Sequence, residues 1–390
     1  MKVALISFHF AEYASRLALA LDARHDVLLI LESANAELEL SRSLRNALVR
    51  RGKVLWFGQQ RRRSAPFQTI RLMHEIRKFR PDVIHIQETG SRVATWLNDF
   101  LGYSVPLVLT VHDPILHSGS DRRAGERSAP YRARLRSRAD RLIVHGDRVS
   151  EEWRGIEPKL SPRLVSVHHG VLGDDQGTVK TFPEQPPVFL FFGRIEAYKG
   201  LEFVLKAGES LASRGLGFRL IIAGTGSVLD LYRPQIRKMP WVELIDRRIH
   251  ADEIPQIFER ASAVVLPYTD ATQSGVAAMA FGFGRPVIAT SVGGLPDVVA
   301  NECNGLLVPP KDVGALAEAM ARIIVSEKLC EKLRRGAMER ASGDLSWDVI
   351  ARETSAVYSD ALRTHGRAYC GSLQVAAGSR KTGERKLDVS

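Results

Sequence analysis

The chain has 390 residues, of which 45% are hydrophobic and 25% are charged. This composition is ordinary for a folded protein and excludes a mostly disordered chain, and the length predicts two domains at roughly 150 residues each. No run reaches the roughly 18 apolar residues that cross a bilayer. The first segment lacks the apolar core and small-residue cleavage site of a signal peptide.

The three cysteines, Cys303, Cys330 and Cys370, lie far apart along the chain. An odd number at such spacing fits neither a disulfide framework nor a cysteine-rich metal site. We therefore expect a protein of the reducing cytoplasm.

The net charge of +11 is concentrated in the first half of the chain. Residues 1–170 contain 28 Lys and Arg against 18 Asp and Glu, and the stretch from Arg42 to Arg80 contains 12 cations and one acid, Glu75. Such a stretch is either an ordinary solvated surface or one that attracts a membrane, a phosphorylated substrate or nucleic acid. Arg61 to Arg63 have no interleaved aromatic residues, so no nucleic-acid partner is expected.

Short apolar runs recur along the first half, separated by stretches long enough for helices. Several are nearly continuous Val, Ile and Leu, which is typical of parallel strands buried on both faces. Strands alternating with helices predict a doubly wound α/β domain over residues 1–175. The predicted strands are Val3–Ser7, Val27–Leu31, Val54–Phe57, Val83–Ile86, Leu107–Val111, Leu142–His145 and Leu164–His168.

A second α/β domain is predicted over residues 188–346, after a linker at Asp174–Pro187 that is rich in Pro and Gly. The cleft between two such domains is the default ligand site. The predicted strands are Val188–Phe192, Leu220–Ala223, Val242–Ile245, Ala263–Leu266, Val287–Thr290 and Leu306–Val308.

Two helices near the end of the chain have clear signals. Asp312 is a suitable N-cap for a helix that places four apolar side chains on one face, namely Leu316, Ala319, Met320 and Ile323. A second helical pattern runs from about Trp347 to Leu362. Residues 366–390 are rich in Gly, Ser, Lys and Arg and are predicted to be a mobile tail.

The strongest local motif is Phe191–Gly200. A buried strand ends, Gly193 turns the chain, and Arg194 and Lys199 lie on the loop that leads to the next helix. Parallel sheets bind ligands at such strand ends, and both cations suit the oxygens of a diphosphate. A plain surface loop with two solvated cations is the alternative.

Two further loops leave strand ends toward the same face. In the first, Gln273, Ser274 and Gly275 precede a helix whose free N–H groups favour an anion, although Ser274 as an N-cap would explain the motif structurally. In the second, Gly293 and Gly294 permit either close approach of a ligand or a tight turn.

These segments together resemble the retaining glycosyltransferases of family 4, which have the GT-B fold of two Rossmann-like domains facing a central cleft. Ser346-Trp347 resembles the family's closing segment, so residues 347–365 are expected to cross back onto the N-terminal domain. The matching pieces are Gly193-Arg194 with Lys199-Gly200, Ile221–Gly226, Gly284–Thr290, Val292–Val298, Asn304–Pro309 and, more weakly, Thr110–Asp113, Ala139–His145 and His169–Val171.

The resemblance implies that the C-terminal domain binds a nucleotide-sugar. Arg194 and Lys199 match the residues that hold the donor diphosphate, and His112 matches the histidine near the transferred sugar. No metal and no cofactor are expected, because the two cations neutralise the departing diphosphate. The matched segments also assign Gly193, Gln273, Ser274, Gly275, Gly293 and Gly294 to donor binding, and His9 and Asp113 to the acceptor side.

Six scattered histidines show no zinc-ligand spacing along the chain and are expected to be mostly structural or exposed: His9, His85, His117, His145, His168 and His169. No metal site is predicted from them.

The chain departs from the family pattern at two places. The family has two glutamates eight residues apart near residues 268–284, the second of which holds the nucleotide ribose. Alignment from Pro286 puts Ala271 and Met279 at these positions, whereas alignment from Gly275 puts Thr272 and Ala280 there. In addition, Phe8–Tyr13 stands where many members have a glycine-rich loop.

The resemblance implies a hexosyltransferase-type glycosyltransferase. It would move a sugar from a nucleotide-diphosphate-sugar to a hydroxyl of a glycan or lipid-linked acceptor, with retention, in surface polysaccharide or glycoconjugate assembly. The basic first half suggests peripheral association with an anionic membrane, at the inner face of the plasma membrane. The missing glutamates leave an alternative from another class, a sugar-nucleotide-binding partner or scaffold protein without turnover.

Overall fold

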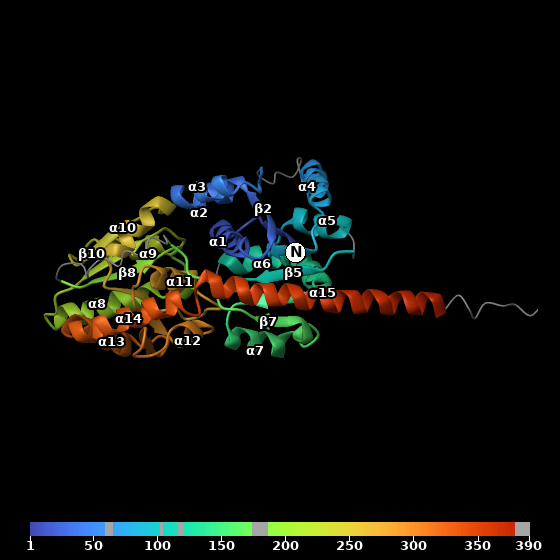
Figure 1. Ribbon diagram of the computed structural model, residues 1–390. Coiled ribbons are helices and arrows are strands. Elements are labelled where there is room, and N and C mark those ends of the chain that lie inside the picture. Colours follow the sequence, from blue (N-terminus) through green and yellow to red (C-terminus); the bar gives the residue numbers. More distant parts are fainter. Residues whose placement is uncertain (59–64, 102–103, 116–119, 174–185, 379–390) are drawn as a thin grey trace, which may run out of the picture.

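Two parallel β-sheets covered by helices form two lobes in the computed structural model of the chain (Figure 1). The structure describes residues 1–58, 65–101, 104–115, 120–173 and 186–378. Residues 59–64 of the basic stretch, most of the predicted linker and residues 379–390 of the predicted tail lie outside the described residues.

The first sheet has seven described strands in the order β3-β2-β1-β4-β5-β6-β7. All neighbours pair in parallel. The strands are β1 (Lys2–Ser7), β2 (Asp26–Glu32), β3 (Val54–Phe57), β4 (Val83–Gln87), β5 (Leu107–Val111), β6 (Arg141–Val144) and β7 (Leu164–Ser166). The helices of this domain are α1 (Ala11–Leu21), α2 (Ser33–Glu39), α3 (Arg42–Arg51), α4 (Ala65–Phe79), α5 (Arg92–Leu101), α6 (Ser120–Arg138) and α7 (Asp147–Ile156).

The second sheet has six described strands in the order β10-β9-β8-β11-β12-β13, again all parallel. The strands are β8 (Val188–Phe192), β9 (Arg219–Ala223), β10 (Val242–Ile245), β11 (Ala263–Leu266), β12 (Val287–Thr290) and β13 (Gly305–Val308). The helices are α8 (Leu201–Ser213), α9 (Leu229–Ile236), α10 (Ile254–Arg260), α11 (Gly275–Gly282), α12 (Leu295–Val298), α13 (Val313–Val325) and α14 (Glu327–Ser342).

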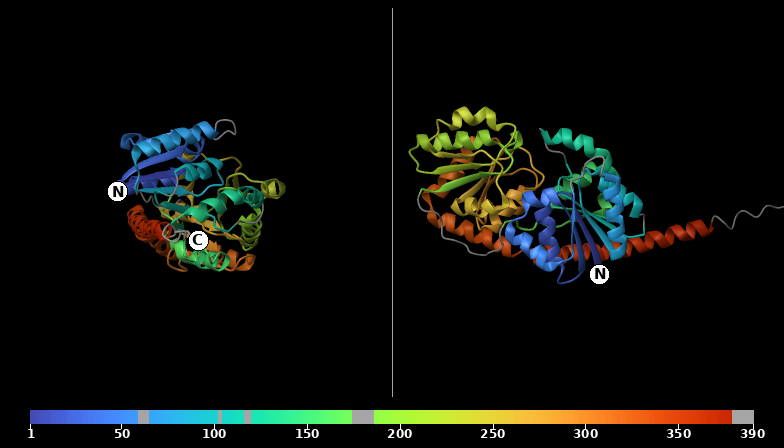
Figure 2. Two further views of the ribbon diagram at one scale, coloured as in Figure 1. Left: turned by 90° about the vertical axis from the view of Figure 1, so that its right-hand side faces the viewer. Right: turned by 90° about the horizontal axis from the view of Figure 1, so that it is seen from above.

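The predicted α/β class and the two doubly wound sheets are confirmed, and each sheet occupies its own lobe when seen from above (Figure 2). Most strands are buried on both faces because helices cover both sides of each sheet, whereas the edge strands β3 and β10 are only partly buried. α13 begins as expected: Asp312 Oδ1 accepts a hydrogen bond from the amide of Ala315 at 2.9 Å, and the four apolar side chains named above are buried.

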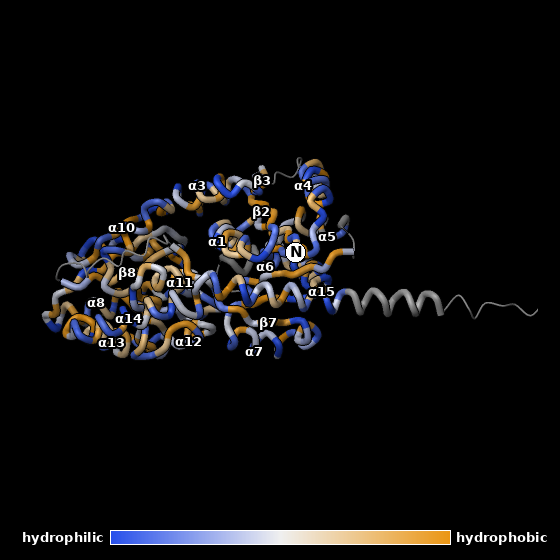
Figure 3. Tube along the Cα trace, in the orientation of Figure 1, coloured by the Kyte–Doolittle hydropathy of each residue, from blue (hydrophilic) through white to orange (hydrophobic). Residues whose placement is uncertain are grey.

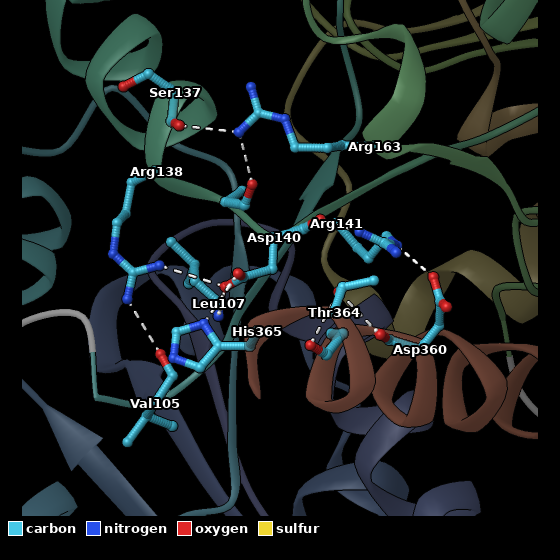
Figure 4. A network of polar contacts seen from close by, with 12 residues as sticks. Val105, Leu107, Ser137, Arg138, Asp140, Arg141, Arg163, Asp360, Thr364 and His365 are labelled. Atoms are coloured by element: carbon cyan, nitrogen blue, oxygen red, sulfur yellow. Dashed lines mark hydrogen bonds and ion pairs between the residues drawn. The ribbon is translucent and has the colours of Figure 1, made fainter. Parts of the chain in front are cut away.

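The last helix, α15 (Trp347–Gly378), leaves the C-terminal domain and packs on the N-terminal one (Figure 1). Asp140 accepts hydrogen bonds from the amide of Leu107 at 2.8 Å and from His365 Nδ1 at 3.0 Å, and Arg141 bonds to Asp360 (Figure 4). The buried face of α15 joins the core of the first sheet through Ile350, Ala351, Val357, Tyr358 and Ala361.

The structure differs from the sequence prediction at the end of this helix. α15 continues past Leu362 through residues 366–378, which composition assigns to the tail. The run Leu373–Ala377 contains Leu, Gln and Ala, which favour helix.

None of the helices in the described part of the chain combines the length and the apolar character that a membrane-spanning helix needs.

Candidate active site

A cleft of about 1270 Å³ lies where the C-terminal ends of strands from both sheets meet. The first sheet contributes the loops after β1, β4 and β5, and the second sheet contributes the loops after β8 and β9 together with the start of α11. Parallel α/β sheets bind ligands at this edge. The cleft therefore combines residues that are distant in sequence into one candidate site.

The loop after β8 places two cations beside the cleft. Gly193 and the exposed Arg194 line it, whereas Lys199 is buried at the end of the loop, with Nζ 5.6 Å from the centre of the Tyr268 ring. A methyl group built on Gly193 would lie 3.2 Å from Lys199 Nζ, so the ammonium group sits next to this turn. Burial raises the pKa of the Tyr268 hydroxyl, and the nearby charge of Arg194 opposes that shift.

Glycines allow this loop to lie against the loop after β9. Gly193 has φ 101° and donates a hydrogen bond to the carbonyl of Ala223 at 2.9 Å. Gly224 has φ 145°, and a methyl group there would approach the carbonyl oxygen of Gly193 to 1.9 Å. Backbone packing therefore fixes the position from which Arg194 extends.

The start of α11 forms another part of the wall. Gln273, Gly275 and Met279 line the cleft. Ser274 is buried, and its Oγ accepts a hydrogen bond from the amide of Ala277 at 3.3 Å, so it acts as the N-cap of the helix. Gln273 Oε1 is a buried acceptor without a hydrogen-bond partner among the described residues.

Gly293 and Gly294 lie behind this wall and not on it. Gly293 has φ 48°, and a methyl group there would come within 1.6 Å of the carbonyl oxygen of Ala271. The amide of Gly294 donates to the carbonyl of Thr272 at 2.8 Å. Of the two alternatives that the sequence left open, ligand approach and a tight turn, the structure shows the tight turn. The two glycines support the loop that ends at Gln273.

On the N-terminal side of the cleft, the expected histidine, His112, lies beneath the ring of Phe10. His112 follows β5, is only 2% exposed, and stacks on Phe10 with ring centres 3.8 Å apart. Its Nε2 donates a hydrogen bond to Gln87 Oε1 at 2.8 Å. Burial and neighbouring histidines lower the pKa of His112 well below its usual range, so the imidazole is neutral. The exposed His9 also lines the cleft.

Contacts across the cleft hold the two domains together. Thr272 Oγ1 of the C-terminal domain donates to Asp113 Oδ1 of the N-terminal domain at 2.9 Å. Within the N-terminal domain, the amide of Gly173 donates to Glu12 Oε1 at 2.8 Å and fixes the end of the segment that leads to the linker. Burial raises the pKa of Glu12, although Arg16 beside it acts in the opposite direction. Asp113 therefore contacts the C-terminal domain through Thr272, and its expected place on the acceptor side stays a prediction.

Two family profiles cover most of the chain. "Glycosyltransferase Family 4" matches residues 11–171, and "Glycosyl transferases group 1" matches residues 186–326. The chain belongs to these glycosyltransferases.

Two curated relatives match this glycosyltransferase over similar shares of its chain. It is 28% identical to the glycogen synthase of Mycobacterium tuberculosis over 74% of this chain and 70% of that protein. It is also 28% identical to the D-inositol 3-phosphate glycosyltransferase of Mycolicibacterium smegmatis, over 73% of this chain and 70% of that protein.

Solved structures share the fold of the glycosyltransferase. Sucrose-phosphate synthase of Thermosynechococcus elongatus matches with TM-score 0.69 and 19% identity, over 93% of this chain and all of that one. Anabaena HepE, solved in complex with UDP-glucose, matches with TM-score 0.68 and 18% identity, over 92% of this chain and all of that one. Both are GT-B neighbours, so the predicted GT-B architecture is confirmed.

Sequence reasoning missed some residues of the cleft of this glycosyltransferase. Glu88 follows β4 and lines the cleft, and its carboxylate accepts hydrogen bonds from Arg136 Nε at 2.6 Å and Nη2 at 2.7 Å. His169 also lines the cleft. Both lie just beyond a strand of the first sheet, and that position was the signal that could have identified them.

Proposed function

We propose that this glycosyltransferase transfers a hexose from a nucleoside-diphosphate-sugar to a hydroxyl of a glycan or lipid-linked acceptor, with retention, in surface polysaccharide or glycoconjugate assembly. The observation that carries the proposal is the loop after β8, in which Arg194 lines the cleft and the buried Lys199 lies next to Gly193 of the same wall. The UDP-glucose complex of HepE, which has the same fold, supports a donor of this class.

The two cations would stabilise the charge that develops on the departing diphosphate, so no metal ion is needed at that position and no cofactor takes part. Arg194 would supply a planar fork of donors and Lys199 a buried point charge. In the front-face picture of retention, the acceptor hydroxyl attacks from the side on which the diphosphate leaves. A diphosphate oxygen then takes the proton, and no protein nucleophile is required.

His112 would lie near the transferred sugar, with His9 and Asp113 on the acceptor side. Since Phe10 stacks on the His112 ring, contact between His112 and a sugar requires Phe10 to turn aside. Gln273 Oε1 is a buried acceptor at the cleft wall and would suit a donor hydroxyl.

A donor titration tests this proposal. Calorimetry with UDP, GDP, ADP and CMP is expected to show selective binding of one diphosphate, which identifies the donor class. Arg194→Ala and Lys199→Met each remove a charge, and Met keeps the apolar stem of Lys199. Turnover should fall about 10²–10³-fold in either variant, as when one donor to developing charge is lost.

Lys206→Ala is the matched control, because Lys206 is an exposed lysine of α8 that forms a surface ion pair with Glu202 at 3.5 Å. Its turnover should match that of the wild type. Turnover within twofold of wild type for both Arg194→Ala and Lys199→Met would contradict the diphosphate assignment.

A second function has one specific observation in its favour. Met279 lines the cleft, and alignment from Pro286 puts this residue where the family has its ribose-binding glutamate. A sugar-nucleotide-binding partner or scaffold would retain Arg194 and Lys199 but lack turnover. Diphosphate binding that Arg194→Ala abolishes, with no product from any acceptor, would favour this second function.

The basic N-terminal domain supports peripheral binding of this cytoplasmic enzyme to an anionic membrane. α3 and α4 lie along the upper edge of that domain in Figure 1 and mix polar and apolar residues in Figure 3. Val49, Phe67 and Ile70 are 68%, 73% and 62% exposed on these helices, beside the cations of the basic stretch. Near an acidic lipid surface each cation contributes about 1 kcal/mol.

Vesicle co-sedimentation tests the membrane proposal. Wild type should sediment with phosphatidylglycerol vesicles at low salt and not with phosphatidylcholine vesicles. The variant Phe67→Ser/Ile70→Ser should sediment less, whereas Leu231→Ser, which changes a 75% exposed apolar residue of the C-terminal domain, should behave like wild type. Failure of the wild type to bind acidic vesicles at low salt would exclude the membrane part alone.

A further inference from the structure

Three histidines converge at the C-terminal ends of neighbouring strands of the first sheet. His112 directly follows β5, His145 directly follows β6, and His169 lies three residues beyond β7. β5, β6 and β7 are adjacent, with Val111 opposite Val144 and Val144 opposite Ser166. All three histidines are buried, and one ligand nitrogen from each lies within 4.8 Å of those of the other two.

Hydrogen bonds to oxygen acceptors determine which nitrogen of each ring carries the proton. His112 Nε2 bonds to Gln87 Oε1 at 2.8 Å, His145 Nδ1 to the carbonyl of Val167 at 3.1 Å, and His169 Nδ1 to the carbonyl of Gly170 at 2.7 Å. These acceptors have no proton to give, so each imidazole must donate through the nitrogen named. The second nitrogen of every ring is therefore left with a lone pair.

Two of these lone pairs are buried without a partner. His112 Nδ1 and His145 Nε2 have no hydrogen-bond partner among the described residues. Leaving a buried polar atom unsatisfied costs about 1–3 kcal/mol, so two in one cluster need a reason. Burial also lowers the pKa values of His145 and His169, to about 3 and about 4, and neutral imidazole is the form that binds a metal ion.

We propose that His112, His145 and His169 bind one divalent transition-metal ion, zinc in the cell. Three imidazoles, each oriented through its other N–H by an oxygen acceptor, form the arrangement typical of zinc ligands and their supporting contacts. Zinc–nitrogen bonds of about 2.0–2.1 Å place tetrahedral ligand atoms about 3.4 Å apart. Each ring therefore needs to move inward by less than about 1 Å from the observed separation.

The surroundings favour such a site. The ring of Tyr13 lies 5.0, 5.3 and 4.9 Å from those of His112, His145 and His169, and encloses the cluster from α1. His112 and His169 line the cleft, so an ion has a route of entry. The ion would lie on the N-terminal domain, separate from the diphosphate cations Arg194 and Lys199 of the C-terminal domain.

The ion would brace the crossover between the domains. His169 begins the segment that leads to Val171, whose amide donates to the carbonyl of Leu345 at 3.1 Å and whose carbonyl accepts from Trp347 Nε1 at 2.7 Å. Binding would therefore link the ends of β5 and β6 to the segment that joins the two domains. The site needs no nucleotide, so this inference does not depend on the proposed donor. With Nε2 bonded to Gln87 and Nδ1 on the ion, His112 would contact a sugar only through its ring and not through a hydrogen bond.

Metal binding to the full chain tests the proposal directly. Protein stripped with chelator and dialysed is titrated with ZnCl₂ by calorimetry and with CoCl₂ by visible absorption. We expect one ion per chain and the absorption bands of tetrahedral cobalt. His145→Gln and His169→Gln should each weaken zinc binding at least about 100-fold, whereas His74→Gln, a change at an exposed histidine on α4, should leave it unchanged.

A second variant keeps the test informative if loss of a buried histidine impairs folding. Gln87→Ala retains all three ligands and removes the acceptor that orients His112, together with a 3.3 Å hydrogen bond to His85, so zinc affinity should fall about 10–100-fold. Circular dichroism verifies the fold of each variant. Absence of the cobalt bands in wild type, or equal zinc binding by wild type, His145→Gln and Gln87→Ala, would overturn the proposal. Diphosphate titrations in chelator report on the donor site separately.

Discussion

Phe10 takes the space that a glycine would leave open at the end of β1. It adopts a left-handed conformation with φ 65°, which is uncommon for a residue with a large side chain. Its ring covers His112, and Phe8 packs on Phe57 with ring centres 5.6 Å apart. The departure of this chain from the family's pattern at the end of β1 thus has a local cause: aromatic packing replaces an open turn at the cleft.

Gly224 fixes the position of the loop after β8 that carries Arg194 and Lys199, which we call the cation loop. An Ala side chain there would meet the carbonyl oxygen of Gly193 at 1.9 Å, so the loop that carries Arg194 must shift. We expect Gly224→Ala to lose about 1–3 kcal/mol of stability and to weaken diphosphate binding at least about tenfold, since misplaced contacts are lost even though every side chain remains.

Gly215→Ala is the matched control for this change. Gly215 also has a positive φ of 71°, but an added methyl group would find no atom within 4 Å. The substitution Gly215→Ala should lower stability through backbone strain alone and leave the diphosphate affinity measured by calorimetry at the wild-type value. Equal affinity for Gly224→Ala and Gly215→Ala would show that the contact between the two loops does not position Arg194.

At the scale of elements, the strands were predictable because helices cover both faces of each sheet. Apolar runs, several of them nearly continuous, mark the strands, and β3, β5, β8, β10, β11 and β12 have the predicted bounds. The end of α15 was not predictable from Gly-rich composition.

The cation loop was found because its residues are close in sequence, and its role in binding stays a prediction. The grouping of His112, His145 and His169 requires knowledge of which strands are neighbours, which spacing along the chain does not contain.

The contact between β4 and α15 predicts a pH effect on stability. His85 of β4 is fully buried and hydrogen-bonds to Tyr358 of α15 and to Thr110, each at 2.7 Å. Burial lowers the pKa of His85 to about 3. Because the unfolded chain takes up this proton near pH 6.5, it binds more protons than the folded chain between about pH 3 and 6.5. Stability should therefore fall with decreasing pH across that range, by about 1.4 kcal/mol per pH unit for this group.

Urea unfolding between about pH 4 and 6 measures this slope. His85→Gln removes the titrating group, so the slope of the free energy of unfolding against pH should be smaller by about 1.4 kcal/mol per pH unit. His74→Gln alters an exposed histidine and should retain the wild-type slope. The same slope in all three proteins would mean that His85 becomes protonated without unfolding.

At the scale of the whole molecule, the two domains meet through α15 and through contacts at the cleft. Arg42 of α3 and Asp252, just before α10, meet across these domains: the amide of Arg42 donates to Asp252 Oδ1 at 2.7 Å, and Arg42 Nε lies 3.7 Å from Oδ2. Figure 1 shows α10 reaching toward α3 of the N-terminal domain. A glycosyltransferase needs its domains closed to exclude water from the reacting sugar, so contacts of this kind affect how readily the cleft closes.

Asp252→Ala should therefore shift the molecule toward an open form. The pair is exposed, so its loss is expected to cost about 0.5–1 kcal/mol, which changes the closing equilibrium about two- to fivefold. If only the closed form holds the donor tightly, apparent donor affinity falls by up to the same factor.

Glu243→Ala is the matched control, because it breaks an exposed ion pair with Arg260 inside the C-terminal domain. Calorimetry should show weaker donor binding for Asp252→Ala alone, and small-angle scattering a larger radius of gyration. An unchanged radius together with unchanged donor affinity would mean that closure is set by other contacts between the domains, such as that between Asp113 and Thr272.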